Sequence, residues 1–327
     1  MRQLAAALAL LAAPLHAGVP EAIDGHILPR HAAFAEAAAA LDAAAQADCT
    51  ADGLKPSYHA AFDAWIGVQH LALGPLQEIG GPLALQFWPD TKGFTARQLA
   101  MALKSEAPET VTREGFAGQS VAVQGFMALE RMLYDEALSA YPAETYACAL
   151  TRAIAHDIAT KAATLAADWP ATAEALRSAG APGNATYLAP AEAAQALFTA
   201  LIAGIEYNDD ARLARPLGSF DKPRPTLAEA WRSGRSQRNL ALSLAALEEF
   251  AALLADGAAP ETRKLFESTQ AWLAGLDEPR LAGVSEPTAR MGIESLASYL
   301  SALKETAAAE LGAHLDVGQG FNALDGD

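Results

Sequence analysis

The stretch AEAAAALDAAAQA, residues 35–47, decides the fold class. Alanine is the strongest helix former and contributes little to a β-sheet. Alanine-rich segments recur along the chain, and the sequence has no run of alternating Val, Ile and Thr of the kind that is typical of strands. The sequence therefore predicts an all-α protein.

The chain is long enough for two helical units. Of its 327 residues, 52% are hydrophobic and 19% are charged, so a sizeable core can form. Patterns of helix starts and stops, among them capping boxes at Thr95 and Thr226, predict helices at about residues 27–47, 56–73, 121–140, 142–169, 191–209 and 226–255, a short helix from 95, and two more from 260 and 286.

A segment rich in Gly, Pro and Asn, residues 177–190, is the best candidate for a domain boundary. It divides the chain into an N-terminal helical bundle over 18–180 and a C-terminal helical bundle with an irregular tail over 181–327. Short connections between helices favour antiparallel packing. The predicted architecture is two tandem domains that each resemble a four-helix bundle.

The N-terminus has the pattern of a secretory signal peptide. One Arg is followed by an apolar stretch over residues 4–13, then by Pro14 and the small residue Ala17. We therefore expect residues 1–17 to be removed by cleavage after Ala17 and the mature protein to be periplasmic. An ordinary apolar N-terminal helix is the alternative. No later segment reaches the roughly 20 apolar residues that span a bilayer, so no membrane insertion of the mature chain is expected.

The charge balance narrows the classes of partner. The formal net charge is −16 at pH 7. A surface of this sign repels nucleic acid and anionic lipid and attracts cations. Because of this repulsion, nucleic acid is not an expected partner. The simpler explanation of the charge is that it keeps the protein in solution.

The two cysteines, Cys49 and Cys148, suit an exported protein with one disulfide. Closing a loop of this size stabilises a fold by roughly 4–5 kcal/mol in the chain-entropy model. Two buried free thiols are the alternative.

Glu130 is the strongest candidate for a functional residue. It lies in the apolar stretch VAVQGFMALERMLYDE, residues 121–136, one helical turn after Met127. A carboxylate on a buried helix face is costly unless it is paired or bound to a metal. The alternative is a hydrogen bond or an ion pair, for instance with an Arg of a neighbouring helix.

The histidines offer weaker signals. His59, Asp63 and His70 share one predicted helical stripe, but His59 and His70 are roughly 16 Å apart at 1.5 Å per residue, too far to chelate one ion unaided. A pair between His59 and Asp63, or a hydrogen bond at the surface, explains the first two. Capping or solvent exposure explains His26 and His31 as well as binding does.

Several familiar catalytic patterns are missing from the sequence. It has no Gly-rich phosphate loop, no CxxC pair, no HExxH motif and no nucleophile-elbow Ser.

The sequence as a whole resembles the imelysin-like family, also called the imelysin peptidase family. The resemblance covers essentially the whole mature chain and rests on five segments in the family's order: AWIGVQHLALGP (64–75), FWPD (87–90), GFMALERMLYD (125–135), WRSGRSQRNL (231–240) and GFNALDGD (320–327). The resemblance implies an exported bacterial protein built from two related four-helix bundles. It also implies a link to iron uptake, and some members are described as metallopeptidases.

The family's motif, Gly-x-His-x-x-Glu, is present here in altered form. Gly125 and Glu130 match its first and last positions, and Met127 stands at the His position. A His and a Glu one turn apart can hold a divalent ion, whereas a soft thioether cannot replace imidazole for zinc or Fe(III). The resemblance therefore implies a binding site more than a peptidase centre.

We expect the site to gather several segments near the junction of the bundles. The expected residues are Gly125, Met127, Glu130, Trp88, Asp90, Ser233, Arg235 and Ser236. In this hypothesis Arg235 neutralises Glu130 or an anionic ligand, and Trp88 forms a wall of the pocket. If iron or another divalent metal binds, Glu130 and His70 are its expected ligands.

The functional hypothesis that follows is a non-peptidase binding component of periplasmic iron or metal acquisition, working with envelope iron-uptake components. Two alternatives stay open. One is a divalent-metal peptidase of the imelysin family with a rebuilt ligand set that uses His70 or His26. The other is an envelope scaffold or binding protein without a metal.

Overall fold

The computed structural model describes residues 18–318, whose regular elements are all helices, with no strand among them. The predicted signal peptide and the GFNALDGD tail lie outside this range. None of the described helices is both long enough and apolar enough to cross a membrane. The all-α prediction is confirmed. The elements are α1 (Val19–Ala22), η1 (Ile23–Ile27), α2 (Leu28–Ala47), α3 (Ala51–Ile66), α4 (Pro75–Glu78), η2 (Pro82–Ala84), α5 (Phe94–Ser105), η3 (Pro108–Val111), α6 (Arg113–Ala117), η4 (Val121–Val123), α7 (Gly125–Tyr134), α8 (Tyr146–Arg177), α9 (Pro190–Tyr207), η5 (Asn208–Leu213), α10 (Ala214–Leu217), η6 (Pro225–Leu227), α11 (Ser236–Ala255), α12 (Pro260–Ala274), η7 (Ala282–Ser285) and α13 (Pro287–His314).

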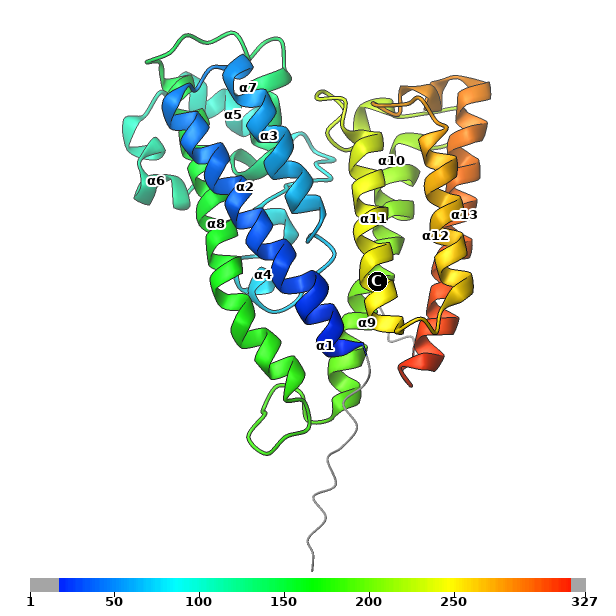
Figure 1. Cartoon of the computed structure of the whole chain (residues 1–327). Coiled ribbons are helices and arrows are strands. Elements are labelled where there is room, and N and C mark those ends of the chain that lie inside the picture. Colours follow the sequence, from blue (N-terminus) through cyan, green and yellow to red (C-terminus); the bar gives the residue numbers. More distant parts are fainter. Residues whose placement is uncertain (1–17, 319–327) are drawn as a thin grey trace, which may run out of the picture.

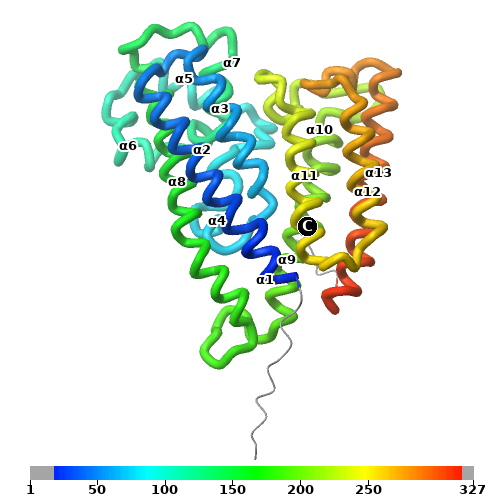
Figure 2. The backbone as a smooth tube through the Cα atoms, viewed as in Figure 1, coloured from blue at the N-terminus to red at the C-terminus, as the bar shows by residue number. Residues whose placement is uncertain are grey.

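The helices form two groups that stand side by side (Figure 1). In the first group α2 packs along both α8 and α3, and α7 packs against α3 and α8. Its core includes stacked rings of Phe62 and Phe126, whose centroids are 4.6 Å apart. In the second group α13 packs against α9 and α12, and α11 packs against α9 and α12 (Figure 2).

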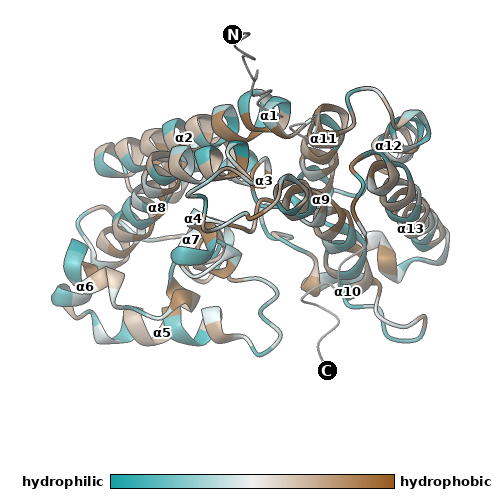
Figure 3. Cartoon of the chain, turned by 90° about the horizontal axis from the view of Figure 1, so that it is seen from below, coloured by the Kyte–Doolittle hydropathy of each residue, from teal (hydrophilic) through white to brown (hydrophobic). Residues whose placement is uncertain are grey.

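The two groups meet through the start of the chain and through α11. The α1 and η1 segments and α3 all contact α11. Figure 3 shows α1 beside α11. The carbonyl of Leu254 lies so close to Gly18 that a Cβ on this glycine would be 2.2 Å from its oxygen. Buried side chains of both groups belong to one continuous apolar cluster.

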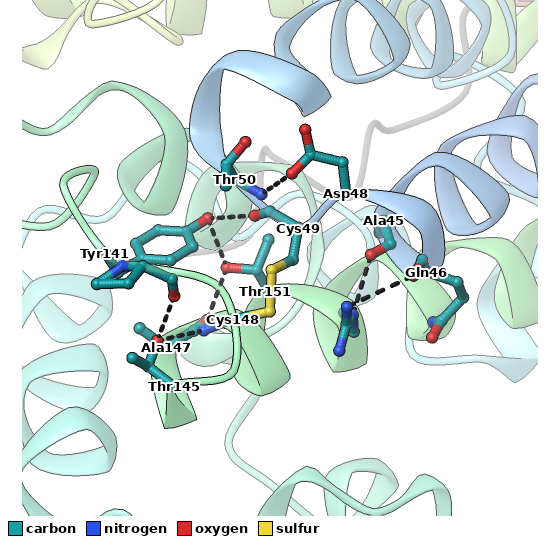
Figure 4. Close-up of a disulfide and its surroundings, with 12 residues drawn as sticks. Ala45, Gln46, Asp48, Cys49, Thr50, Tyr141, Thr145, Ala147, Cys148 and Thr151 are labelled. Atoms are coloured by element: carbon teal, nitrogen blue, oxygen red, sulfur yellow. Dashed lines mark hydrogen bonds between the residues drawn. A yellow bond between two sulfur atoms is a disulfide. The ribbon is translucent and has the colours of Figure 1, made fainter.

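The disulfide between Cys49 and Cys148 is confirmed, with Cα atoms 5.4 Å apart (Figure 4). It joins the connection between α2 and α3 to the first turn of α8. The Tyr141 hydroxyl donates to the Cys49 carbonyl (2.9 Å) and receives a hydrogen bond from Thr151 (3.0 Å). These contacts fix the loop before α8 against the same covalent link.

Several helix boundaries differ from the predicted ones, and tertiary contacts explain the differences. The helix predicted over 121–140 is α7 alone, which begins at Gly125 and ends at Tyr134. Gly125 has φ +69°, and a Cβ there would come within 2.1 Å of the Leu85 carbonyl oxygen. The Phe126 amide donates to that oxygen (2.8 Å). Only glycine permits this approach, which sets the start of α7 against the 85–93 loop.

Proline was a poor guide to helix ends. α3 begins at Ala51 and contains Pro56, and it ends at Ile66 rather than near residue 73. α8 runs from Tyr146 through Pro170 to Arg177. The residue before Pro170, Trp169, is fully buried and packs against His31 with ring centroids 4.8 Å apart. This packing compensates for the backbone hydrogen bond that the proline removes.

Neither capping-box pattern caps a helix. α5 begins at Phe94, and its first amides are taken by the Asp90 carboxylate rather than by Thr95. Residues 226–229 form part of a 3₁₀ turn and a loop, and α11 begins only at Ser236. Glu229, the last residue of the second pattern, turns inward and is buried with the Arg212 guanidinium (2.8 Å).

Candidate binding site

A small cavity of about 90 Å³ lies where three segments from the two halves of the chain come together. One side is the 87–95 loop and a second is α7, both from the first half. The third side is built from Arg215 and the 226–232 segment of the second half. The close contact between Gly125 and Leu85 brings the first two sides together. Met127 and Glu130 are one helical turn apart on α7, so they lie on the same wall of the cavity.

Glu130 is fully buried, and its two carboxylate oxygens differ. Oε1 accepts hydrogen bonds from the Ser233 amide (2.9 Å) and the Ser233 hydroxyl (2.8 Å). Oε2 has no hydrogen-bond partner among residues 18–318. Burial raises the pKa of Glu130, although the Ser233 hydrogen bonds and the nearby Arg232 and Arg131 oppose this effect. One oxygen is thus fixed by the second half of the chain, while the other is buried without a hydrogen-bond partner among the described residues.

Three guanidinium groups line the same cavity. Arg131 and Arg232 share the Asp135 carboxylate, at 2.9 Å and 3.5 Å. Arg232 also lies over the Trp231 ring, 4.3 Å from its centroid. Burial, together with the adjacent Arg131, lowers the pKa of Arg232. The third group, Arg215, has a buried Nε that donates to no acceptor within the described range.

Trp88 and Asp90 line the cavity as expected. Partial burial disfavours the charged form of Asp90, but hydrogen bonds from the Thr95 and Phe94 amides outweigh it and lower its pKa. Asp90 therefore acts as a carboxylate cap on α5, with both amides at 2.8 Å. Trp88 packs edge-on against Tyr207 of α9 and so bridges the two helical groups.

The expected ion pair between Arg235 and Glu130 does not form. Arg235 is fully buried and donates to Asp63 (2.5 Å), to His59 Nδ1 (2.8 Å) and to Asn239 (3.1 Å). The turn at 230–235 presents Ser233 to Glu130 instead. Ser236 donates to the Glu229 carbonyl (2.7 Å) and so supports the start of α11. Neither Arg235 nor Ser236 lines the cavity.

The histidines are committed to other contacts. His59 does not bond to Asp63, because its Nε2 meets the Tyr134 hydroxyl (2.6 Å) and its Nδ1 meets Arg235. His70 does not join Glu130 in the cavity lining. Its Nε2 lies 3.1 Å from the Nε2 of His26, at the contact between the two helical groups. The structure therefore does not bring His70 and Glu130 together in this cavity, and their role as metal ligands stays a prediction.

His26 and His31 are buried rather than exposed or capping a helix end. His26 Nδ1 lies 2.9 Å from Glu249 on α11, and burial lowers the pKa of His26 to about 3. Burial likewise lowers the pKa of His31 to about 4, and its Nδ1 lies 2.8 Å from the Ile27 carbonyl. These rings are neutral at pH 7.

The cavity residues do not fit a hard divalent metal ion. Met127 contributes a thioether beside Glu130, and three arginine residues line the same cavity. In the part of the chain that the structure describes, no three His, Cys, Asp or Glu side chains are grouped as a metal site. Nearby positive charge and soft sulfur both oppose such binding.

The sequence predicted the lining residues of the 87–95 loop and of α7, but not the three arginine residues of the cavity. Arg131, Arg215, Arg232 and Trp231 were not among the expected site residues, although all line the cavity. Trp231 and Arg232 open one of the segments that carry the family resemblance, and Arg131 directly follows Glu130. Arg215 gave no signal, because it lies in α10, outside the segments that carry the family resemblance.

Comparisons with known proteins show the family and the fold. The model of the family described as Imelysin, Peptidase_M75, matches residues 27–307. A crystal structure of an imelysin-like protein from Psychrobacter arcticum 273-4 is similar with a TM-score of 0.77 and 19% identity, over 93% of this chain and 98% of that one. A crystal structure of a putative iron-regulated protein A precursor from Parabacteroides distasonis ATCC 8503 is similar with a TM-score of 0.72 and 15% identity, over 94% of this chain and 97% of that one. No curated protein matches the sequence.

Proposed function

Because the chain belongs to the imelysin family, we propose that it is a non-peptidase binding protein of periplasmic iron or metal acquisition. The observation that carries the proposal is the free, fully buried Oε2 of Glu130 in a cavity lined by tryptophan and arginine side chains. A buried polar atom without a partner is costly unless something binds it. A concave site with aromatic walls and a few convergent polar groups is typical of small-ligand binding.

Peptide hydrolysis is a poorer match to the same residues. A metallopeptidase needs a metal with an open position and a base that activates water. Met127 occupies the position where the family motif has His, and His70 and His26 hydrogen-bond each other instead of facing Glu130. The rebuilt ligand set of the peptidase alternative would have to break that pair. A scaffold role without a metal is compatible with the fold but leaves the free Glu130 oxygen unexplained.

The iron connection and the location rest on separate support. One structural neighbour is named an iron-regulated protein A precursor. Residues 1–17 have the pattern of a cleaved signal, and the disulfide suits an oxidising compartment. We propose that envelope iron-uptake components are its partners.

The function is tested by deleting the gene in its native host and measuring growth with and without an iron chelator. The proposal expects a growth defect only under chelation, restored by the wild-type gene but not by a form lacking residues 2–17. In parallel, the purified protein is incubated with unfolded protein substrates and zinc or iron. Metal-dependent cleavage, or equal growth of the deletion strain under chelation, would overturn the proposal.

A further inference from the structure

The cavity carries a local excess of positive charge in a chain whose formal net charge is −16. The cavity has two acidic residues, and one of them, Asp90, already accepts hydrogen bonds from the amides at the start of α5. Arg131 and Arg232 share a single partner, Asp135. Arg215 adds a third guanidinium whose buried Nε lacks an acceptor among residues 18–318. The excess calls for an acceptor with negative charge.

Glu130 constrains what that acceptor can be. An ionised Glu130 would repel an anion placed beside its free Oε2. A protonated Glu130 would instead donate a hydrogen bond from Oε2, while Oε1 continues to accept from Ser233. Burial already raises the pKa of this carboxyl. Two carboxyl groups in contact share one proton, because both cannot be ionised side by side.

We propose that the cavity binds the carboxylate group of a small organic acid, with Arg215 donating to one ligand oxygen and protonated Glu130 donating to the other. No covalent bond forms or breaks. The complex gains one proton, which resides on Glu130 and comes from solvent. This inference names the ligand class for the site of the proposed function and rests on that function only for its biological setting.

The size and walls of the cavity favour a carboxylate over other ions. A volume of about 90 Å³ corresponds to roughly three water molecules, so it admits a carboxylate with a short carbon stem while the rest of a larger acid extends outward. Trp88 and Trp231 offer apolar surface to such a stem. A divalent cation would face three guanidinium groups. A phosphate dianion would carry more charge against Glu130 and Asp90.

Among the titratable groups around this site, Glu130 is the carboxyl whose pKa burial raises and that can take up the proton. The titratable groups around it are Arg131 on its own helix, Arg232 beside Ser233, Tyr58 of α3 and Tyr134 of α7, with Asp90 across the cavity. Burial raises the pKa of Tyr58 and raises that of Tyr134 to about 12, so both stay neutral. Ligand affinity should therefore fall as pH rises.

Isothermal titration calorimetry of the full mature protein with succinate tests the proposal, using acetate, inorganic phosphate and zinc chloride as comparison probes. Runs in two buffers of different ionisation enthalpy give the number of protons taken up. Arg215→Met should weaken succinate binding about tenfold to a hundredfold, as expected for the loss of a charge-assisted hydrogen bond. Glu130→Gln, which keeps a donor at every pH, should abolish proton uptake and make affinity independent of pH. Arg280→Met, at an exposed arginine, is the matched control and should bind like the wild type.

Three results would overturn the proposal, given variants that melt like the wild type. These are no succinate or acetate binding at millimolar concentration, equal binding by Arg215→Met, and tighter binding of phosphate or zinc than of either acid. The growth test keeps the two proposals apart. Succinate binding that depends on Arg215 without an iron phenotype would sink only the proposed function. An iron phenotype without carboxylate binding would sink only this inference.

Discussion

Two opposing local effects act on the carboxyl group of Glu130. Ser233 supplies two donors to Oε1, which favours the charged form, while complete burial favours the neutral form. Burial prevails, and the pKa of Glu130 is raised. In the folded protein this residue therefore keeps its proton at a higher pH than it does in the unfolded chain.

Linkage makes the stability of the protein depend on pH through this residue. Between the ordinary carboxyl pKa near 4.5 and the raised folded value, the native state binds more protons than the unfolded state, so stability falls as pH rises. Glu130→Gln removes this titration. Its stability relative to the wild type should therefore increase from pH 4 to pH 8, by about 1.4 kcal/mol for each pH unit that separates the two pKa values. Urea melts at several pH values measure the difference, with Glu305→Gln, exposed on α13, as control. A difference that stays constant with pH would contradict the assignment.

Met127 allows a second prediction for a single residue. Met127→His places imidazole one turn before Glu130 on the cavity wall, but Arg131, Arg215 and Arg232 still line it. Two ligands beside three cations should give zinc affinity only weakly above that of the wild type. Adding Arg215→Met should raise it further, because a repulsive charge is lost. Metal titration at pH 7.5 compares the three proteins, and strong zinc binding by the single variant would show that the arginines do not decide selectivity.

At this scale the sequence predicted residues better than their roles. Gly125 and Glu130 were found from the motif, yet only the structure shows that Gly125 is required by the Leu85 carbonyl. Arg235 was expected to neutralise Glu130 or an anionic ligand, whereas it contacts Asp63 and Ser233 contacts Glu130. One turn of backbone decides whether Arg235 or Ser233 faces α7, and no local pattern encodes that turn.

Between elements, the contact of η1 with α11 depends on a chain of hydrogen bonds that links two neutral imidazole rings to the Glu249 carboxylate. His26 Nδ1–H donates to Glu249, so its Nε2 must accept from the Nε2–H of His70. Arg30 donates to the same Glu249 carboxylate (2.6 Å). Phe250 packs against both imidazole rings. Protonating His26 at Nε2 would break its hydrogen bond with His70, and protonating either ring would bury a charge.

Acid should therefore weaken this contact. Burial lowers the pKa of His26 to about 3 and that of His70 well below 6.5, so below about pH 6.5 the unfolded chain binds protons that the native state does not. The contribution of these two histidines to stability should fall as pH decreases from 6.5, by about 1.4 kcal/mol per pH unit for each histidine. His70→Gln keeps a donor and should reduce the slope by one group. His314→Gln, exposed near the end of α13, should leave it unchanged. Equal slopes in all three proteins, measured by denaturant melts between pH 4 and 7, would contradict the neutral pair.

Element type was predictable, and element boundaries were less so. Alanine-rich composition is sufficient to predict helix. Boundaries failed where a distant partner overruled a local signal, as when Trp169 packing carries α8 through Pro170. The segment 226–229 carries a capping pattern, but its Glu229 stabilises more as a buried partner of Arg212 than as a cap.

For the whole molecule, the question is whether the predicted domains 18–180 and 181–327 behave independently. A buried polar network crosses between them. Arg212 donates to Glu229 (2.8 Å) in the second half and to Gln69 (2.5 Å) in the first. Glu229 in turn accepts from Gln86 of the first half (2.5 Å). These groups are shielded from water, so separating the halves would leave ionised side chains without partners unless water enters.

We therefore expect one cooperative unfolding transition, with Glu229 as its most sensitive point. Glu229→Gln keeps the side chain's size but leaves the Arg212 charge buried without a counter-ion, which should cost about 3–5 kcal/mol. Glu261→Gln removes the exposed pair with Lys264 and should change stability by less than about 0.5 kcal/mol.

Urea unfolding followed by far-ultraviolet circular dichroism and by tryptophan fluorescence tests both points. Coincident transitions would mean that the two helical groups unfold as one unit, because the buried polar network couples them. Two separated transitions, with Glu229→Gln shifting only one, would instead show that each bundle is stable by itself and that the cavity at their junction can open without unfolding.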